Sequence, residues 1–270
     1  MQEPNRLLIF DLKGKLAHFR KFYTNSSSLS YSFPPRTTLS GLIAGMLGKE
    51  RDSYYEEFAI NNCKIALSIR KPIKKIMQTV NYIRTKKEED GYTKNIKVIE
   101  HSIKRKINKY PTPLELVVPS KFKDEIVYRV YLCHNDNTIM DDLYLLLRNG
   151  KTRYPVFLGL SEFLGYVEFI DDVPLQNIKE HKSEEPIEIF SVCNSAHISE
   201  FEYGNDIDTL QYIDEKMPLE FARGREIKKT ASLIHEKNQK PIRARLKVPY
   251  IQITYKDQEK VIKENITFME

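Results

Sequence analysis

Residues 10–48 read FDLKGKLAHFRKFYTNSSSLSYSFPPRTTLSGLIAGMLG and contain the pattern that decides the fold. They begin inside an apolar run, residues 7–12, that shows little alternation of apolar and polar side chains. Such a run is typical of a strand buried on both faces, and Gly14 after it indicates a turn. We therefore expect a buried strand over 6–13, followed by a loop.

The second half of this stretch predicts a helix. Apolar residues recur at helical spacing, and two prolines before them hold the backbone extended. A threonine, Thr37 or Thr38, is a suitable N-terminal cap, and Gly48 is a suitable C-terminal cap. We expect a helix over 37–48 after a loop over 14–36 that is rich in basic and aromatic side chains.

The following residues extend this pattern to the order β-α-β-β-α-β. That order is ferredoxin-like and RRM-related, with two helices on one face of an antiparallel sheet, and it predicts an α+β fold. Alternation in the later strands leaves one sheet face, or its rim, available to nucleic acid. The further elements expected are a short helical segment over 51–59, strands over 63–70, 126–133 and 164–170, and a helix over 138–149.

A long basic excursion over residues 71–115 separates two of these strands. Residues 71–110 hold twelve Lys or Arg against four acidic residues, a local charge of +8 in a chain whose net charge is +6. A connection of this length inside a compact domain is normally functional or disordered, and its apolar positions favour an extended β-hairpin. The expected arms carry Ile73, Ile76 and Val80 on one side and Ile96, Val98 and Ile99 on the other, with a polar tip over 86–91.

The C-terminal part of the chain has a different pattern. Short strand-like runs alternate there with acidic and Gly/Asn turns, which predicts a smaller β-rich domain over 173–270 beside a ferredoxin-like domain over 1–172. Residues 223–247 are again basic, with nine Lys or Arg against two acidic residues. Because charge is segregated along the chain, we expect polyanion contacts at particular places.

Several classes of function have no support in the sequence. No apolar run is long enough for a membrane helix and no secretory signal is present, so we expect a cytoplasmic protein without a membrane partner. Cys63, Cys133 and Cys193 are widely spaced and are interpreted as small core residues. No His or Cys spacing suits a metal, and no phosphate-binding loop or nucleophile elbow occurs. We therefore expect no metal, cofactor or small-molecule substrate.

Three groups of residues are candidates for nucleic-acid contact, because Arg and Lys can hold phosphates and aromatic rings can stack on unpaired bases. The alternative for any one of them is a solvated or core-packed side chain. The loop and helix start contribute Lys13, Lys15, His18, Arg20, Lys21, Tyr23, Tyr31, Arg36 and Thr37, and the hairpin contributes Lys74, Lys75, Arg84, Lys86, Lys87, Lys104, Arg105 and Lys106. A third group, which suits RNA, DNA or an acidic partner surface, is Arg223, Arg225, Lys228, Lys229, Arg243 and Arg245.

Short motifs in separate parts of the chain carry a resemblance to a known family. They are AHFR at 17–20, PRTT at 35–38 followed by GLI at 41–43, TPLEL at 112–116 and LGLSEF at 158–163. Together they resemble the CRISPR-associated RAMP subunit of type I Cascade, the fifth Cas protein family, and most closely its type I-B branch. The resemblance is specific because separated motifs agree in order over about the first 170 residues.

The resemblance implies an RNA-binding role in a ribonucleoprotein complex of antiviral defence. The family's subunit caps the 5′ handle of the guide RNA (crRNA), and a thumb-like hairpin at the position of residues 71–115 kinks that RNA. Its other partners are the Cascade large subunit and the backbone RAMP subunit, and it meets target DNA indirectly within the complex. Base pairing of the guide then reads the target, while the protein supplies geometry and charge.

The same resemblance leaves an enzymatic alternative open. In the type I-C branch the subunit is itself a metal-independent endoribonuclease that processes pre-crRNA with a Tyr, Lys and His set. His18 with Lys21 and either Tyr23 or Tyr31 is conceivable in that role, because such cleavage needs a general base and a general acid. No residue-by-residue match to that set is found, so we expect a non-catalytic protein in which His18 contacts RNA or is structural.

Overall fold

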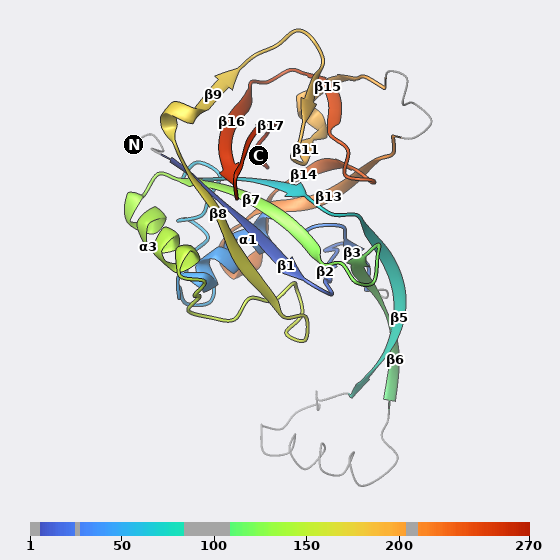
Figure 1. Ribbon diagram of the computed structural model, residues 1–270. Coiled ribbons are helices and arrows are strands. Elements are labelled where there is room, and N and C mark those ends of the chain that lie inside the picture. Colours follow the sequence, from blue (N-terminus) through green and yellow to red (C-terminus); the bar gives the residue numbers. More distant parts are fainter. Residues whose placement is uncertain (1–5, 25–27, 84–108, 204–209) are drawn as a thin grey trace.

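A computed structural model describes residues 6–24, 28–83, 109–203 and 210–270 (Figure 1). It contains a four-stranded antiparallel sheet in the order β4-β7-β1-β8. The strands lie within a few residues of those predicted, and β1 is buried along its whole apolar run. Their bounds are β1 Arg6–Gly14, β4 Cys63–Ile69, β7 Ile126–His134 and β8 Gly165–Pro174.

Two α-helices complete the order β-α-β-β-α-β along this part of the chain. Helix α1 (Arg36–Met46) follows β1, and helix α3 (Asn137–Arg148) follows β7. The side chain of Asp136 caps α3 by accepting the N–H of Thr138 at 2.8 Å. Both helices agree with the sequence-based predictions, and the described chain as a whole is mostly β with few helices.

The start of α1 differs from the predicted threonine cap. Pro35 is the N-cap residue, and no side chain caps the helix. The Pro35 carbonyl accepts the N–H groups of Thr38 at 2.9 Å and of Leu39 at 3.0 Å. Because proline has its φ preset near that of a helix, it leads directly into the first turn. Gly48 does adopt the left-handed conformation expected after the helix, with a φ of +80°.

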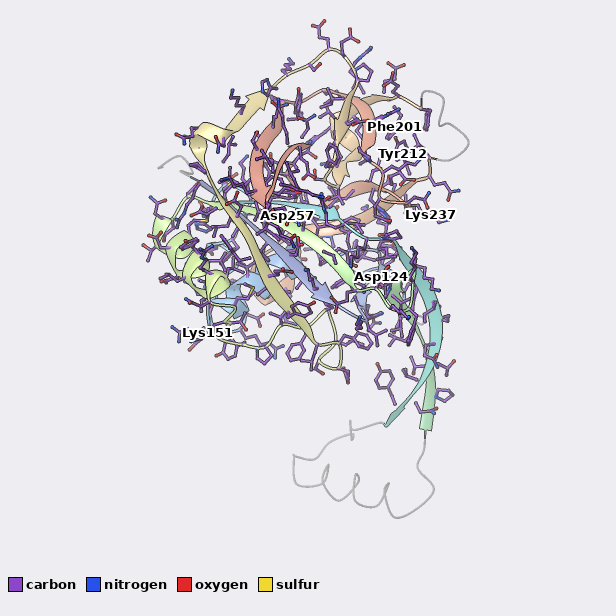
Figure 2. The ribbon with its side chains drawn as sticks, viewed as in Figure 1. Asp124, Lys151, Phe201, Tyr212, Lys237 and Asp257 are labelled. Atoms are coloured by element: carbon purple, nitrogen blue, oxygen red, sulfur yellow. The ribbon has the colours of Figure 1, made fainter. Side chains whose placement is uncertain are left out.

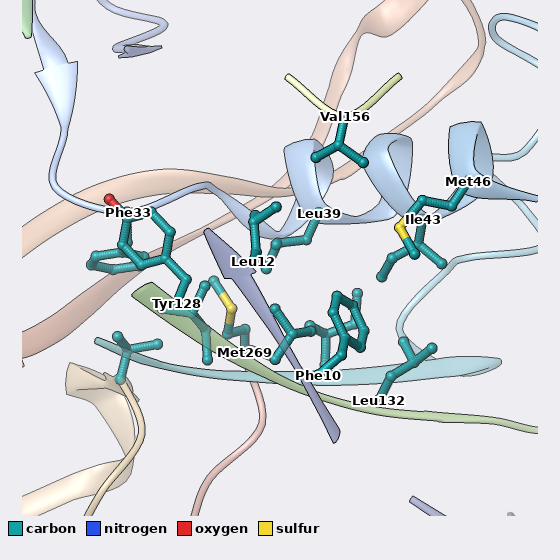
Figure 3. Packing of buried hydrophobic residues seen from close by; sticks show 14 of the residues in the cluster. Phe10, Leu12, Phe33, Leu39, Ile43, Met46, Tyr128, Leu132, Val156 and Met269 are labelled. Carbon is teal, nitrogen blue, oxygen red and sulfur yellow. The ribbon is translucent and has the colours of Figure 1, made fainter. Parts of the chain in front are cut away.

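Alternate residues of β1 divide the interior into two layers. Phe10 and Leu12 pack with Leu39 and Ile43 of α1 in a large buried cluster (Figure 3). All four side chains are completely buried. This close-packed layer holds α1 on one face of the sheet, because burying apolar side chains is the main force that favours folding.

The opposite face of the sheet is covered, which corrects the expectation of a face available to nucleic acid. Leu7 and Ile9 of β1 pack there against Ile253 and Ile266. The expectation fails because strands from the C-terminal part supply the apolar partner that this face needs. The covering sheet has the order β17-β16-β9, with β9 Ile178–His181, β16 Tyr250–Asp257 and β17 Lys260–Ile266.

The C-terminal residues form short strands, as predicted, and they share the core of the first part. Met217 and Leu219 lie in one buried cluster with residues of α1 and β1. The division into domains at residue 173 stays a prediction.

Two further sheets, β10-β15-β12 and β11-β14-β13, consist of β10 Ile187–Ile189, β11 Cys193–Asn194, β12 Ile198–Phe201, β13 Tyr212–Phe221, β14 Ile227–Glu236 and β15 Ile242–Leu246. Short 3-10 helices are η1 Leu175–Asn177, η2 Ser195–His197 and η4 Arg223–Arg225.

A two-stranded arm projects from this body (Figure 1). Strand β5 (Ile73–Ile83) pairs antiparallel with β6 (Lys109–Pro119) along its whole length. The first predicted arm therefore agrees with β5, whereas its partner is β6 instead of a strand at 96–99. The prolines inside β6 are compatible with this pairing, because β6 is an edge strand of a two-stranded ribbon, where proline is tolerated. Residues 84–108, with the predicted tip, lie outside the described residues.

Three smaller features complete the comparison with the sequence. Residues 51–59 form turns instead of the predicted short helix, and Asp52 has a left-handed φ of 63° that is incompatible with one. Cys63, Cys133 and Cys193 are all buried and free, as expected for small core residues. No described helix is long and apolar enough to cross a membrane.

Candidate nucleic-acid interface

Segments far apart in the sequence meet at the base of the arm. Ala17 forms a bridge with Val117 of β6, and the N–H of His18 donates to the Leu158 carbonyl at 3.0 Å. These contacts bring the AHFR, TPLEL and LGLSEF motifs together around a cavity of about 500 Å³, which we call the loop–arm cavity. Its lining residues are His18, Phe19, Arg20, Ser28, Thr38, Tyr82, Thr112, Leu114, Gly159 and Leu160.

The loop after β1 is built as a small hairpin against the arm. Strands β2 (Phe19–Arg20) and β3 (Ser30–Tyr31) pair antiparallel. The N–H of Ser30 donates to the Glu115 carboxylate at 2.8 Å, and the N–H of Glu115 donates to the Ser28 carbonyl at 2.9 Å. The described part of the loop is therefore held on β6 by its backbone, which fixes where its side chains begin.

Gly159 is a site residue that the sequence reasoning did not single out. Its φ is +98°, a conformation that side chains with a Cβ rarely adopt. A Cβ at this position would lie 1.8 Å from the carbonyl oxygen of His18. Gly159 thus permits the close approach of two backbones that closes one wall of the loop–arm cavity. The only sequence signal was a glycine inside the LGLSEF motif.

His18 is buried, with 3 % of its surface exposed, although it lines the cavity. Its Nδ1 lies 2.7 Å from the Glu115 carbonyl oxygen, which can only accept, so this nitrogen carries the proton. Burial lowers the pKa of the imidazole below its ordinary value, and the ring is neutral at pH 7. A neutral ring fixed by a backbone carbonyl fits the structural or contact role expected for His18.

Arg20 and Tyr23 are exposed, as contact with RNA requires. The Arg20 guanidinium donates from Nη2 to the Thr24 carbonyl at 3.2 Å, which is its one hydrogen bond to the described residues, and the side chain is exposed to solvent. Tyr23 has 51 % of its surface exposed and packs edge-on against Phe22. These two side chains suit a phosphate and a base face, respectively.

The lysines next to the loop are engaged by acidic residues. Lys13 forms an ion pair with Glu168 of the neighbouring strand β8. Lys15 is exposed, with its Nζ 3.6 Å from a Glu125 carboxylate oxygen. The Lys15 pair is exposed and contributes little to stability, so it does not prevent Lys15 from turning to a phosphate. The Lys13 side chain is only 19 % exposed, so its ion pair holds it more firmly on the sheet.

Three predicted contact residues are buried, and the expectation that they reach RNA is wrong for this fold. The Tyr31 hydroxyl donates to the Lys216 carbonyl at 2.8 Å, and its ring is completely buried. The Arg36 guanidinium donates to the carbonyls of Leu219, Phe58 and Cys63, at 3.1, 3.0 and 2.5 Å. Thr37 is buried beside it. The physical reason is that strand β13 packs over the start of α1, which closes the predicted anion site.

Lys21 and Lys75 meet a buried acid that the sequence did not connect with them. Glu215 of β13 has 3 % of its surface exposed, and its carboxylate lies 3.1 Å from Lys21 Nζ and 2.8 Å from Lys75 Nζ. It also accepts the N–H of Ser32 at 2.8 Å. Glu215 therefore ties the loop, the arm and the C-terminal part together, and the two lysines stabilise this junction instead of facing solvent.

The pKa of Glu215 makes this junction sensitive to acid. Burial raises the pKa of the carboxyl group, but Lys75, Ser32 and Lys21 together hold it below its ordinary value. Because the folded-state pKa is depressed, its stabilisation is present above the unfolded pKa of about 4.3 and is lost as pH falls through the folded value.

Glu215→Gln should therefore destabilise the protein most at neutral pH. We expect the difference in unfolding free energy between this variant and the wild type to narrow below about pH 4. Urea unfolding at several pH values measures it. Glu184→Gln is the matched control, because Glu184 is exposed and no such difference is expected. A difference that stays constant with pH would contradict the assigned role.

On the arm, Lys74 is exposed, and Tyr82, which lines the loop–arm cavity, has 45 % of its surface exposed. Tyr82 is an aromatic residue next to the basic segment of the hairpin and was not among the predicted contact residues. The remaining predicted contacts of the hairpin lie outside the described residues and stay predictions, namely Arg84, Lys86, Lys87, Lys104, Arg105 and Lys106.

The third predicted group is not brought together as one site. Arg223 and Arg225 lie in η4, whereas Arg243 and Arg245 lie on β15 in another sheet. Arg223 and Lys229 are exposed. The other four pair with acids at 3.0–3.7 Å, namely Arg225 with Asp52, Lys228 with Glu220, Arg243 with Glu188 and Arg245 with Glu200. These ion pairs neutralise much of the local charge that the sequence indicated.

The match to a protein family agrees with this geometry. Residues 7–234 match the family described as CRISPR-associated protein (Cas_Cas5). The match runs from β1 through the arm to β14 and includes every segment of the loop–arm cavity, so the chain is a CRISPR-associated protein. It belongs to the Cas5 family. A comparison with curated protein sequences found no match.

Several solved structures are similar over most of the chain. One, titled CRISPR RNA-guided surveillance complex, has 15 % identity and a TM-score of 0.42, and covers 90 % of this chain and 91 % of its own. Another, a Cas protein, has 11 % identity, a TM-score of 0.39 and coverages of 87 % and 98 %. A functionally uncharacterized protein from Streptococcus mutans has 16 % identity, a TM-score of 0.34 and coverages of 90 % and 94 %. The family assignment rests on the sequence match and not on these TM-scores.

Proposed function

We propose that this protein is a non-catalytic crRNA-binding subunit of a type I-B-like Cascade complex in the cytoplasm. The observation that carries the proposal is the loop–arm cavity, where three motifs of the family resemblance meet beside exposed cationic and aromatic side chains. Residues 1–172 would form the ferredoxin-like RAMP domain, and the arm would be the basic hairpin that shapes the RNA. The 5′ handle of the guide is the segment we assign to this surface.

The side chains of the cavity suit a single RNA strand. Within the cavity, the exposed Arg20 offers its guanidinium to a phosphate and Tyr82 offers an exposed ring to a base. Tyr23, in the same loop but outside the cavity lining, offers a second exposed ring. His18 is neutral and fixed, so it shapes the wall without adding charge. In this proposal the large subunit and the backbone RAMP subunit bind other surfaces of the protein, and target DNA is met only within the assembled complex.

Charge reversal at Arg20 and Lys74 together should weaken binding of a single-stranded guide RNA. Each lost phosphate contact lowers the slope of log K against log salt by about 0.7 for a single strand, so the double variant should lose about 1.4. Fluorescence anisotropy with labelled RNA between about 50 and 200 mM salt measures this slope.

Lys151→Glu is the matched control for that experiment. Lys151 is an exposed lysine that Figure 2 places near α3, away from the arm. Charge reversal at Lys151 makes the protein more negative, as the double variant does. Any general electrostatic effect therefore appears in the control as well as in the double variant. Equal slopes for the Lys151→Glu protein and the Arg20→Glu/Lys74→Glu protein would remove the loop–arm cavity from the proposed RNA site.

The absence of catalysis is the second part of the proposal. His18 is buried, Lys21 is paired with Glu215, and the Tyr31 hydroxyl donates to a backbone carbonyl, so these groups have partners other than a scissile phosphate. We expect repeat RNA to remain intact when incubated with the purified protein without added metal. Cleavage that is lost in His18→Ala would instead support the endoribonuclease alternative.

A further inference from the structure

One turn presents an aromatic ring entirely to solvent. Residues 120–124, between β6 and β7, read SKFKD, and Phe122 at the corner has 99 % of its surface exposed. No other large apolar residue among those the structure describes is as exposed. An exposed phenyl ring forgoes the stabilisation of burial, and it becomes a candidate for contact with a ligand where an ordered backbone and neighbouring charges accompany it.

The exposure of Phe122 does not come from a loose loop. The N–H of Asp124 donates to the Lys121 carbonyl at 3.0 Å and closes a tight turn. The N–H of Ser120 donates to the Pro72 carbonyl at 2.8 Å, which fixes the turn to the start of the arm. Lys15 Nζ donates to the Asp124 carbonyl at 3.1 Å and ties the turn to the loop after β1. The backbone therefore holds the ring outward.

The ring is framed by positive charge. Lys121 and Lys123 flank it in the turn, and Lys71 precedes the proline that anchors the turn; all three are exposed. Two acids follow Phe122 in the sequence. Glu125 pairs with Lys15 at 3.6 Å and accepts the Tyr166 hydroxyl at 2.6 Å. The negative charge of Asp124 then remains to balance the positive charges of the three lysines.

The geometry points to a binding site for an unpaired nucleobase, which stacks on Phe122 while Lys71, Lys121 and Lys123 neutralise the flanking phosphates. A flat ring between cations matches the alternation of base and phosphate in a single strand. A membrane contact would require several large apolar side chains, and this turn has one. The proposal rests on the proposed function, since it requires a nucleic-acid-binding chain. It adds a contact separate from the loop–arm cavity, at the base of the arm where Figure 2 labels Asp124.

The ligand could be guide RNA or a single strand of DNA, because both offer an unpaired base with flanking phosphates. Binding assays with RNA and DNA oligonucleotides of one sequence, and with the corresponding DNA duplex, distinguish these sources. We expect Phe122→Ala and Phe122→Leu to weaken single-strand binding about 5- to 100-fold, and duplex binding to change less than twofold. Phe122→Trp should retain the affinity, because the aromatic face is kept.

Phe122→Trp also provides a direct signal of stacking. The chain contains no tryptophan, so the new indole is its only one, and we expect its fluorescence to be quenched on addition of the preferred oligonucleotide. Tyr154→Trp is the matched control, because Tyr154 is 54 % exposed, follows α3, and has its N–H bonded to the Gly45 carbonyl of α1 at 3.3 Å. Its fluorescence should not change.

Each outcome decides for or against the site. Two results would overturn the stacking site if the wild type binds single strands. One is full affinity in Phe122→Ala, and the other is fluorescence of Phe122→Trp that is not quenched. Either result leaves the proposed function intact. Full affinity in Phe122→Leu with loss in Phe122→Ala would show that apolar bulk and not the aromatic face supports binding, and it also overturns the stacking site. A wild-type protein that binds no RNA overturns the proposed function itself. Circular dichroism checks that each variant is folded.

Discussion

Gly159→Ala should destabilise the protein by about 3 kcal/mol or more and should impair RNA binding. The substitution forces a side chain into a φ of +98° and places its Cβ 1.8 Å from the His18 carbonyl oxygen. Because that oxygen belongs to the backbone, it cannot move aside as a flexible side chain can. We expect the loops that carry His18 and Gly159 to separate, which opens the loop–arm cavity. Urea unfolding and RNA anisotropy measure the two effects.

Gly150→Ala separates the backbone strain from the collision. Gly150 also has a positive φ, of +60°, but a Cβ there would meet no atom within 4 Å. The left-handed conformation alone costs about 1–2 kcal/mol, so this variant should be the milder of the two and should bind RNA normally. Equal destabilisation by the two substitutions would show that the contact with His18 is unimportant.

Arg129→Met should destabilise the protein by about 3–5 kcal/mol, the second large effect. Arg129 of β7 is 4 % exposed and donates to both oxygens of the buried Asp11 carboxylate, at 2.7 and 2.9 Å. It also donates to the Tyr255 hydroxyl at 2.9 Å and pairs with Asp257 at 2.7 Å. Without Arg129, Asp11 is left as an uncompensated charge between the central sheet and β16. Urea unfolding monitored by circular dichroism gives the change.

The double variant Asp11→Leu/Arg129→Met tests the reason for that loss. Removing both partners of a buried pair is often nearly neutral, because no charge then remains without a counterpart. We expect the double variant to be more stable than Arg129→Met alone, and a double-mutant cycle gives the coupling energy. Additive losses from the two single substitutions would mean that the pair itself does not hold the layers together.

The local elements were predictable because they depend on short-range patterns. The unbroken apolar run of β1, the helical spacing in α1 and the alternation in β4 each correspond to an element of the structure. The ends of helices were less predictable, because the backbone conformation of a single residue decides where a helix begins or stops. Pro35, and not a threonine, begins α1, and a left-handed Asp52 replaces the short helix predicted after it.

The candidate site was predictable in part. The motifs around His18, Leu114 and Gly159 were recognised, and the structure places all three on one cavity. The side chains of Tyr31 and Arg36 were misjudged, because their burial depends on β13, which is nearly 200 residues later in the chain. A basic or aromatic residue in a loop looks the same in the sequence whether it faces solvent or a distant strand.

The sequence by itself determined the order of strands and helices and the segregation of charge, because hydrophobic period, proline and glycine act over a few neighbouring residues. Only the tertiary structure decided which cations remain exposed. Glu215 engages Lys21 and Lys75, while Arg20 and Lys74 stay on the surface. The physical reason is that burial and ion pairing depend on which distant segments pack together, and that contact is a property of the folded chain.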